Sequence, residues 1–287
     1  NGLPAGTYSV VVTDANGCIA NTSISLTEPP VLVGVADVLS DYNGSDVSCF
    51  NYTDGLIGVE SSGGTPGYVY QWFTSSGNPL GAGNNQPNVG QGNYFALVTD
   101  INGCTVIAPV VVTQPLELIM APIITSNYFG NQVSCVGAND GAGYIYATGG
   151  TPVYTYNWGT NPVLTTQNVT TLGEGTFNVV VTDANGCTDN AQITLTANPL
   201  PTVNLPPPVY GCIGGEITLQ SNPGPSTNCQ WTISNGNVYN DCGPINLTFE
   251  NGACLDVQLV ISTSLGCADT MSLTDYICVA PNPVASF

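Results

Sequence analysis

The sequence predicts an all-β protein made of tandem immunoglobulin-like β-sandwich domains arranged as an extended rod. Short β-branched and aromatic runs recur along the chain, each followed by a turn signal, and no helical periodicity of useful length appears between them. The same sequence markers also return after about 85 residues, which is close to the length of one small sandwich. Together these two observations favour a row of similar domains over one large fold.

One turn motif sets the period of the repeat. The string Val-Thr-Asp-x-Asn-Gly-Cys ends at Cys18, Cys104 and Cys187, at steps of 86 and 83 residues. A Gly-Gly-Thr-Pro string begins at Gly63 and again at Gly149, in the same register. Because Asp-x-Asn-Gly between apolar runs is a strong hairpin signal, each copy is expected to join the last two strands of a sandwich.

Strands are expected on both sides of these turns, and the prolines that follow them end each unit because proline removes a ladder donor. The predicted strands are residues 68–73, 94–98 and 105–112 in the first full unit and 154–158, 177–181 and 192–196 in the second. Trp72, Trp158 and Trp231 stand where a sandwich usually buries a core tryptophan, and a sugar-stacking platform is the alternative.

The period divides the chain into five parts. They are the second half of one repeat at 1–30, two full repeats at 31–115 and 116–200, a cysteine-rich domain at 201–280, and the start of a further domain at 281–287. We expect a longer chain at both ends, since the first residues resemble the middle of a domain and no secretion signal is visible in this segment.

Composition excludes many functions. The 287 residues include 19 acidic side chains and no Lys, Arg or His, for a net charge of −19. Catalytic triads need an imidazole and Schiff bases need a lysine, while nucleic acids and anionic membranes attract positive charge. Glycoside hydrolysis would need two carboxylates facing each other, and the acids here are scattered. We therefore expect a non-enzyme without cofactors, without nucleic-acid partners and without membrane insertion, whose acids lie in water.

The eleven cysteines, in a chain without histidine, favour disulfides over metal binding. In each full repeat one cysteine precedes the second strand and one follows the last hairpin turn, so both are expected near the same end of the sandwich. This predicts the pairs Cys49–Cys104 and Cys135–Cys187 and leaves Cys18 without a partner in this segment.

The last domain holds six cysteines. Analogy with the repeats predicts Cys212–Cys267, because these two are 55 residues apart, as are Cys49 and Cys104. The remaining pairs are predicted as Cys229–Cys242 and Cys254–Cys278. Six cysteines allow fifteen pairings, so the other arrangements stay open at this point.

The repeat resembles the SprB repeat of gliding-motility adhesins from bacteria with type IX secretion. The matching residues are Cys49, Asp54-Gly55, Gly63 to Pro66, Trp72 and Asp100 to Cys104, and then Cys135, Asp140-Gly141, Gly149 to Pro152, Trp158 and Asp183 to Cys187. The last domain resembles a cysteine-rich polycystic-kidney-disease-type (PKD) domain, although Ser234 to Asn237 stand where the usual Gly-Asp-Gly would be. The resemblance implies a secreted cell-surface filament, moved along the outer membrane, that binds substrata such as polysaccharide.

Two ligand sites are candidates. The segment Asp41 to Asp46 has oxygen ligands at alternate positions, as calcium loops do, but it lacks the glycine and the bidentate glutamate of such loops, so a solvated loop is the alternative. The tyrosines of two aromatic strands alternate and share a face in each, and this strip is the candidate sugar-contacting surface; it consists of Tyr68, Tyr70, Tyr154 and Tyr156.

Three functions fit these features. The first is a stiff, disulfide-stapled stalk of a cell-surface adhesin, with further domains of the same chain, a polysaccharide substratum and the type IX secretion and gliding machinery as partners. The second is a set of accessory domains on a secreted carbohydrate-active enzyme, which a catalytic domain elsewhere in the full chain would favour. The third is a subunit of a polymeric extracellular filament, which strand exchange between molecules would favour.

Overall fold

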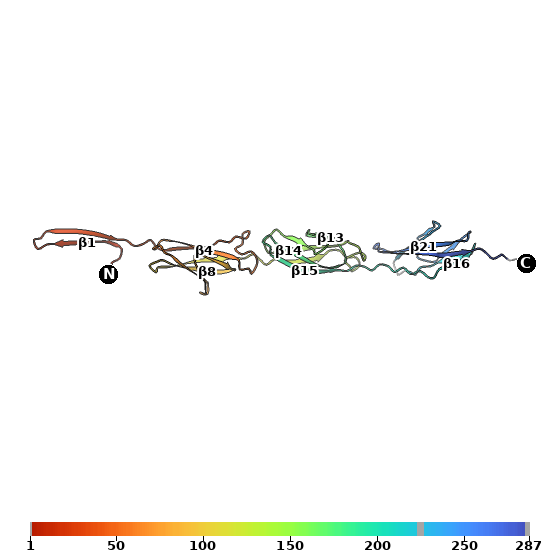
Figure 1. The fold of residues 1–287 in the computed structure, drawn as a ribbon, viewed down its shortest axis with the longest axis horizontal. Coiled ribbons are helices and arrows are strands. Elements are labelled where there is room, and N and C mark those ends of the chain that lie inside the picture. The colour runs from red at the N-terminus through yellow and green to blue at the C-terminus, as the bar shows by residue number, and fades with distance from the viewer. Residues whose placement is uncertain (1, 223–226, 285–287) are drawn as a thin grey trace. The chain divides into compact units, whose positions relative to one another are not determined.

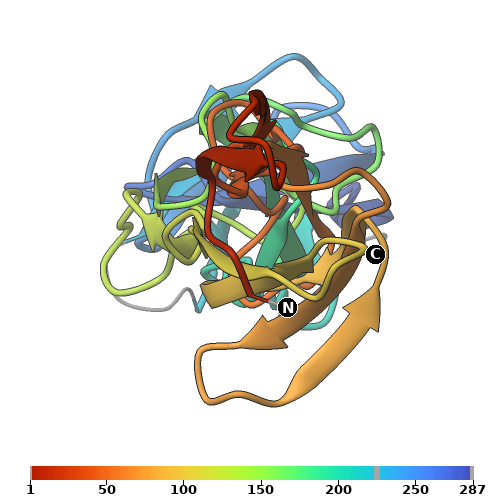
Figure 2. The same cartoon turned by 90° about the vertical axis from the view of Figure 1, so that its left-hand side faces the viewer.

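A computed structural model describes residues 2–222 and 227–284. Over these residues the chain forms only strands, turns and loops, as both views of the ribbon show (Figures 1 and 2). No helix in the described part of the chain is long and apolar enough to cross a membrane.

The chain begins with a two-stranded antiparallel hairpin, β1 (Gly6–Thr13) and β2 (Ile19–Leu26). Its turn is closed by the motif that ends at Cys18, and Gly17 in this turn has a φ of +84°, which suits glycine. Nearly all of its side chains are exposed, including Val10 and Ile24.

Residues 31–115 form a sandwich of two sheets. One sheet has the order β3-β4-β7 and the other the order β6-β5-β8-β9, which is the arrangement of strands A-B-E and C′-C-F-G in immunoglobulin-like domains. The strands are β3 (Val33–Val38), β4 (Gly55–Ser62), β5 (Val69–Thr74), β6 (Pro79–Ala82), β7 (Asn85–Val89), β8 (Gly92–Thr99) and β9 (Thr105–Val112). Trp72 lies at the centre of the core, fully buried among residues of both sheets such as Ile57 and Val98.

Residues 116–200 repeat this plan with sheets β10-β11-β13 and β12-β14-β15. The strands are β10 (Ile119–Ile124), β11 (Gly141–Thr148), β12 (Thr155–Asn157), β13 (Asn168–Leu172), β14 (Gly175–Thr182) and β15 (Thr188–Leu195). Trp158 is again fully buried, together with apolar side chains such as Ile145 and Val179.

The last domain has a five-stranded sheet, β16-β22-β21-β18-β19, and a two-stranded sheet, β17-β20. The strands are β16 (Val209–Cys212), β17 (Glu216–Leu219), β18 (Thr227–Ile233), β19 (Val238–Tyr239), β20 (Ile245–Thr248), β21 (Cys254–Thr263) and β22 (Ala268–Ala280). The short β16 runs parallel to the end of β22, and Trp231 and Tyr276 are fully buried in the core.

The chain groups into two compact units whose boundary does not follow the repeats. The first contains residues 1–119 together with 148–154 and 182–188, and the second contains 120–147, 155–181 and 189–287. Two segments at one end of the second repeat therefore belong to the same unit as the whole first repeat. The contact between the first repeat and these two segments lies within that unit.

The predicted all-β class and the tandem immunoglobulin-like sandwiches are confirmed, and all three tryptophans are core residues. The expected strand 105–112 coincides with β9. The rod arrangement stays a prediction. Of the further domain expected at 281–287, Val284 is exposed and residues 285–287 lie outside the described residues.

Candidate functional site

The first half of the candidate site is a folded loop between β3 and β4 that ends in Cys49. The Asp41 carboxylate accepts a hydrogen bond from Gly44 N–H (2.7 Å), and Tyr42 and Ser45 form a bridge across this small turn. The Tyr42 hydroxyl donates to the carbonyl of Asp54 (3.1 Å), where β4 begins. Local hydrogen bonds thus fix the loop before any other repeat contacts it.

Asp54 holds the residues just before Cys49. Its Oδ1 accepts a hydrogen bond from Ser48 N–H at 3.0 Å. Burial is the largest single influence on the Asp54 carboxyl and raises its pKa, but the hydrogen bonds from Ser48 outweigh it, so the pKa lies below its ordinary value. An ionised Asp54 therefore keeps the Ser48 carbonyl oriented toward the neighbouring repeat.

The second half of the site is the turn between β14 and β15, which carries Cys187. Asp183 Oδ1 accepts from the N–H groups of Asn185 and Cys187 (both 2.9 Å), and Asp183 Oδ2 accepts from Thr151 N–H (2.7 Å). Gly186, with φ +87°, completes the turn. Here the side chain of Asp183 takes the turn-capping role that the motif predicts.

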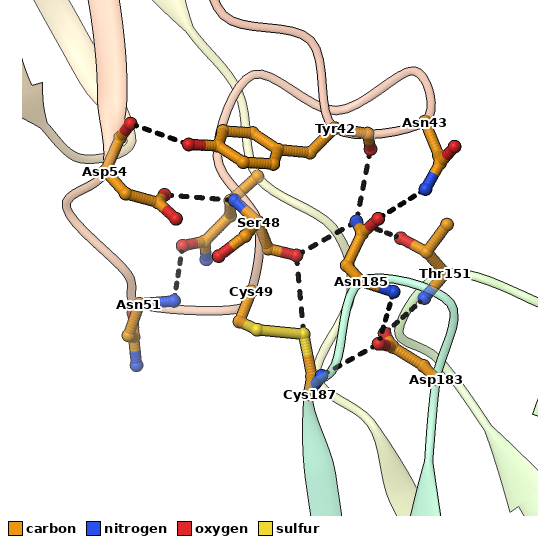
Figure 3. The surroundings of a disulfide bond; sticks show 11 residues. Tyr42, Asn43, Ser48, Cys49, Asn51, Asp54, Thr151, Asp183, Asn185 and Cys187 are labelled. Atoms are coloured by element: carbon orange, nitrogen blue, oxygen red, sulfur yellow. Dashed lines mark hydrogen bonds between the residues drawn. A yellow bond between two sulfur atoms is a disulfide. The ribbon is translucent and has the colours of Figure 1, made fainter. Parts of the chain in front are cut away.

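The loop and the turn come from successive repeats and meet at a disulfide between Cys49 and Cys187 (Figure 3). Asn185 Nδ2 lies 3.1 Å from the carbonyl oxygens of both Tyr42 and Ser48 and donates to them. Asn185 Oδ1 in turn accepts from Asn43 Nδ2 at 2.6 Å. One asparagine therefore pairs with two backbone carbonyls of the loop beside the covalent bond, and this joint is the candidate functional site.

The predicted pair Cys49–Cys104 is wrong because these cysteines lie at opposite ends of one sandwich. Asp46 Oδ2, in the Cys49 loop, accepts from the N–H and hydroxyl of Thr113, just past the far end of β9. Cys104 directly precedes β9, which has 8 residues and thus spans about 26 Å at roughly 3.3 Å per residue. A disulfide requires Cα atoms within about 7 Å, so Cys104 is a free, exposed thiol.

The predicted pairs Cys135–Cys187 and Cys212–Cys267 are wrong for the same reason. Cys212 pairs in register with Ala280 at the end of β22, whereas Cys267 directly precedes β22 and lies at its other end. Cys212 is free and exposed. The bonds that do form are Cys49–Cys187 and Cys135–Cys267, which span 138 and 132 residues of sequence.

A second joint links residue 135 to the last domain. Asp140 Oδ1 accepts from Ser134 N–H (3.0 Å), as Asp54 does from Ser48, and hydrogen bonds from the side chain and the backbone of Ser134 lower the pKa of Asp140. Cys267 Sγ lies 3.2 Å from the Ser134 carbonyl. Burial and the nearby Asp140 charge raise the pKa of the Tyr128 phenol. The joint thus repeats the loop side of the first one, while Leu265 stands in its turn where Asn185 stands in the other.

The remaining two disulfide predictions are confirmed. Cys229 bonds to Cys242 and Cys254 bonds to Cys278, both inside the last domain. Cys18, expected without a partner in this segment, is free.

The Gly-Gly-Thr-Pro string supports the segment that enters each repeat. Gly64 N–H donates to the carbonyl of Pro30 (2.7 Å). A Cβ on Gly63 would lie 1.9 Å from the carbonyl oxygen of Val31, and one on Gly149 would lie 1.8 Å from that of Glu117. Only glycine permits this close approach of two backbone segments.

The tyrosine strip is largely engaged inside the repeats. The Tyr68 and Tyr154 hydroxyls donate to the carbonyls of Gly63 (2.7 Å) and Gly149 (2.6 Å), so both tyrosines hold the glycine bend. Tyr70 shares a hydrogen bond with Ser61, and Tyr156 is half-buried like the others. A sugar-contacting role for this strip stays a prediction.

The acids of the Asp41–Asp46 segment serve the loop itself. Asp41 accepts from Gly44 and Asp46 from Thr113, and the two carboxylates are used separately. Within residues 2–222 and 227–284, no group of three or more Cys, Asp or Glu side chains is placed to hold a metal ion. The calcium interpretation stays untested.

Sequence reasoning found the residues of the joint but not their pairing, because it placed the loop and the turn at one end of the sandwich. The role of Asn185 was also missed. The Asn-Gly-Cys string places an asparagine two residues before Cys18, Cys104 and Cys187, but the hairpin turn alone already explains this asparagine, so the sequence held no separate signal for the joint.

Comparison with protein families matches residues 42–77 to the SprB repeat. This segment contains the Cys49 loop, the Gly63 bend and Trp72. A comparison with curated proteins finds no match.

Several solved structures of serial domains are similar to the chain. The three N-terminal domains of the bacteriophage RB49 highly immunogenic outer capsid protein have 14% identity and a TM-score of 0.37, with 88% of this chain and 100% of that chain covered. The titin I-band fragment I67–I69 has 13% identity and a TM-score of 0.37, with 90% and 100% covered. A Ca²⁺-stabilized adhesin that helps an Antarctic bacterium bind ice has 16% identity and a TM-score of 0.43, with 96% and 82% covered.

Proposed function

We propose that this chain is a non-catalytic, load-bearing part of a cell-surface adhesin, a stalk that carries a binding tip away from the cell. The observation that carries the proposal is the covalent joint, in which the Cys49 loop of one repeat is bonded to the Cys187 turn of the next. The match of residues 42–77 to the SprB repeat supports the same role.

The joint gives the two repeats two covalent connections instead of one. The first connection is the chain itself, which passes from the first repeat to the second near Leu116. The carbonyl of Leu116 accepts a hydrogen bond from Gly150 N–H at 2.8 Å. The disulfide and the Asn185 hydrogen bonds form the second connection. Two domains joined by a single linker can rotate about it, whereas a second attachment at a separate point restricts that rotation. This is the property a stalk requires.

The two long disulfides also interleave, because Cys135 lies between Cys49 and Cys187 in the sequence. Without them, the 218 residues from Cys49 to Cys267 could extend to about 780 Å at roughly 3.6 Å per residue. With them, the shortest covalent path crosses to Cys187, returns along 52 residues to Cys135 and crosses to Cys267, for about 190 Å at most. The pair of bonds therefore limits how far a pulled chain can lengthen.

Single-molecule pulling on the full chain, held at both termini, tests this role. We expect the fully unfolded contour of the oxidised chain to be shorter than that of the reduced chain by about 600 Å. The variant Cys229→Ser/Cys242→Ser is the matched control: it removes a disulfide that is not on the shortest path, so its oxidised contour should equal that of the parent. If reductant leaves the contour unchanged, the load-bearing role is wrong.

We further propose that the adhesin serves gliding motility, that type IX secretion exports it, and that it is held at the outer membrane and contacts surface polysaccharide. The SprB match supports this finer role. Labelling intact producing cells with an antibody against this chain, and comparing gliding of cells with and without its gene, tests it. Surface label with normal gliding of the deletion strain would leave the stalk but refute the gliding role.

A further inference from the structure

The cysteines outside the two bonds of the last domain fall into two structural classes. In the turn class, the cysteine carbonyl accepts from the N–H four residues earlier, and the members are Cys18, Cys104, Cys187 and Cys267. In the loop class, the cysteine carbonyl accepts from the N–H three residues later, and the members are Cys49, Cys135 and Cys212. These bonds are 2.8 to 3.1 Å long, so each class has one backbone geometry.

Both long disulfides follow the same rule. Each joins a loop cysteine to the turn cysteine of the domain that follows, as Cys49–Cys187 and Cys135–Cys267 do. The free thiols are the turn cysteines Cys18 and Cys104 and the loop cysteine Cys212. The rule therefore assigns to Cys104 a partner from a loop, and no loop cysteine of a preceding domain is present among the described residues.

More than the cysteine is repeated around Cys104. Asp100 Oδ1 accepts from the N–H groups of Asn102 and Cys104 (both 2.9 Å), and Asp100 Oδ2 accepts from Thr65 N–H (2.9 Å). Asn102 Nδ2 donates to Thr65 Oγ1 at 2.8 Å, the same bond that Asn185 makes to Thr151 at 3.0 Å. The hydrogen bond from Thr65 is the main cause that lowers the pKa of Asp100, which keeps this cap ionised.

The two faces differ in what covers them. Asn185 and Cys187 are half-buried beneath the loop of the preceding repeat, while Asn102 and Cys104 are exposed. The Asn102 side chain is already oriented by Thr65, as that of Asn185 is by Thr151. An ordered asparagine beside a free thiol is thus presented in the arrangement that, 83 residues later, receives a loop.

We propose that the face formed by Thr65, Asn102 and Cys104, the Cys104 face, binds the cysteine loop of another repeat of this kind and closes a disulfide with it. The occupant is a loop like Tyr42–Asp54, whose carbonyls before the cysteine accept hydrogen bonds from Asn102. This binding follows from the equivalence of the two faces and does not depend on the adhesin role.

The chemistry is thiol–disulfide exchange with a low-molecular-weight disulfide such as oxidised glutathione as the oxidant. The Cys104 thiolate attacks the oxidant, forms a mixed disulfide and releases one glutathione thiolate. The thiolate of the loop cysteine then attacks the Cys104 sulfur and releases the second glutathione. In total the two cysteines lose two protons and two electrons, and two molecules of reduced glutathione form.

A lengthened chain tests the proposal. A second copy of residues 32–117 is inserted after residue 117 of the full chain, which places the Cys49 loop of the first copy before the Cys104 face of the second. After refolding in glutathione buffer, free thiols are alkylated and unreduced peptides are mapped by mass spectrometry. We expect a new disulfide between Cys49 of the first copy and Cys104 of the second, and free thiols only at Cys18, Cys104 of the first copy and Cys212.

Two features keep the test decisive. The bond from Cys49 of the second copy to Cys187 must also form, which shows that the repeats have folded. Asn102→Ala in the second copy should make the new bond roughly tenfold easier to reduce, since the hydrogen bonds that it removes from the loop are together worth about 1.4 kcal/mol. If Cys49 of the second copy bonds to Cys187 while Cys49 of the first copy and Cys104 of the second are found alkylated or bonded to glutathione, the proposal is wrong.

Discussion

Asn185 Nδ2 donates to the carbonyl of Ser48 at 3.1 Å. Ser48 directly precedes Cys49, and Asn185 lies two residues before Cys187, the partner of Cys49 in the disulfide. The hydrogen bond and the disulfide thus join the same two segments. Because the amide has only two hydrogens, the three acceptors around it share them. Asn185 therefore positions the loop for the disulfide.

Asn185→Ala should make the Cys49–Cys187 bond about tenfold easier to reduce, because the hydrogen bonds lost from the closed joint share the two amide hydrogens and are together worth about 1.4 kcal/mol. The measurement is the fraction reduced in a series of glutathione buffers, with alkylation and peptide mapping. Asn102→Ala is the matched control, since the same turn position there contacts no loop and the variant should leave Cys49–Cys187 unchanged. If both variants made the Cys49–Cys187 bond equally easier to reduce, the contact between Asn185 and the loop would not be the cause.

The pattern of thiols gives a direct prediction. Alkylation of the native chain should label Cys18, Cys104 and Cys212 and no other cysteine, because the other eight are bonded. Unreduced peptide mapping should find one peptide that contains both Cys49 and Cys187. A peptide joining Cys49 to Cys104 instead would restore the pairing inside one repeat and contradict the joint.

The sequence was sufficient for features that depend on local pattern. The Asp-x-Asn-Gly turn fixes the register of β8 and β9, and an aromatic strand after a glycine bend places Trp72 in the core. The pairing of Cys49 depends instead on which end of the sandwich its loop occupies. That is decided by the direction of β3 and by Asp46–Thr113 contacts 67 residues apart, which no local pattern encodes.

The joint between repeats was missed for a related physical reason. The periodicity shows which cysteines occupy equivalent positions in successive repeats. It does not show whether a cysteine is bonded within its own repeat or to the next one. The compact unit that contains residues 1–119 also takes in the turn at 182–188, which shows that some contacts of this chain join residues more than one repeat length apart.

Gly63→Ala should destabilise the first repeat strongly. A Cβ there would lie 1.9 Å from the Val31 carbonyl oxygen, and the φ of +70° disfavours alanine as well. Gly77→Ala is the control for the second effect, because φ is +84° but no atom lies within 4 Å of its added Cβ. We expect a loss of about 1 kcal/mol for Gly77→Ala and roughly 3 kcal/mol or more for Gly63→Ala.

Thermal unfolding and limited proteolysis of both variants measure this difference. The segment that the Gly63 bend supports, near Val31, should become the first cleavage site in Gly63→Ala. Similar stability of the two variants would show that the backbone contact between Gly63 and Val31 is not tight in solution.

Asp140 makes the stability of the second repeat depend on pH. Hydrogen bonds from the side chain and the backbone of Ser134 lower its pKa in the folded chain, while the unfolded value is about 3.9. Its stabilising contribution is therefore fully present above about pH 4 and is lost as the pH falls through the lower folded pKa. Acid also neutralises the other carboxylates of a chain with 19 acids and no bases, which relieves repulsion, so the wild type alone cannot separate the two effects.

Asp140→Asn separates them. At pH 7 the variant should be less stable by about 1 kcal/mol, because the charge-assisted acceptor is lost, and its deficit should shrink as the pH falls below about 4. Glu174→Gln removes one exposed charge from the same repeat and should behave like the wild type at both pH values. Thermal unfolding between pH 7 and pH 2 is the measurement. A deficit of Asp140→Asn that persists undiminished at pH 2 would mean that packing, not the ionised carboxylate, accounts for its effect on the loop before Cys135.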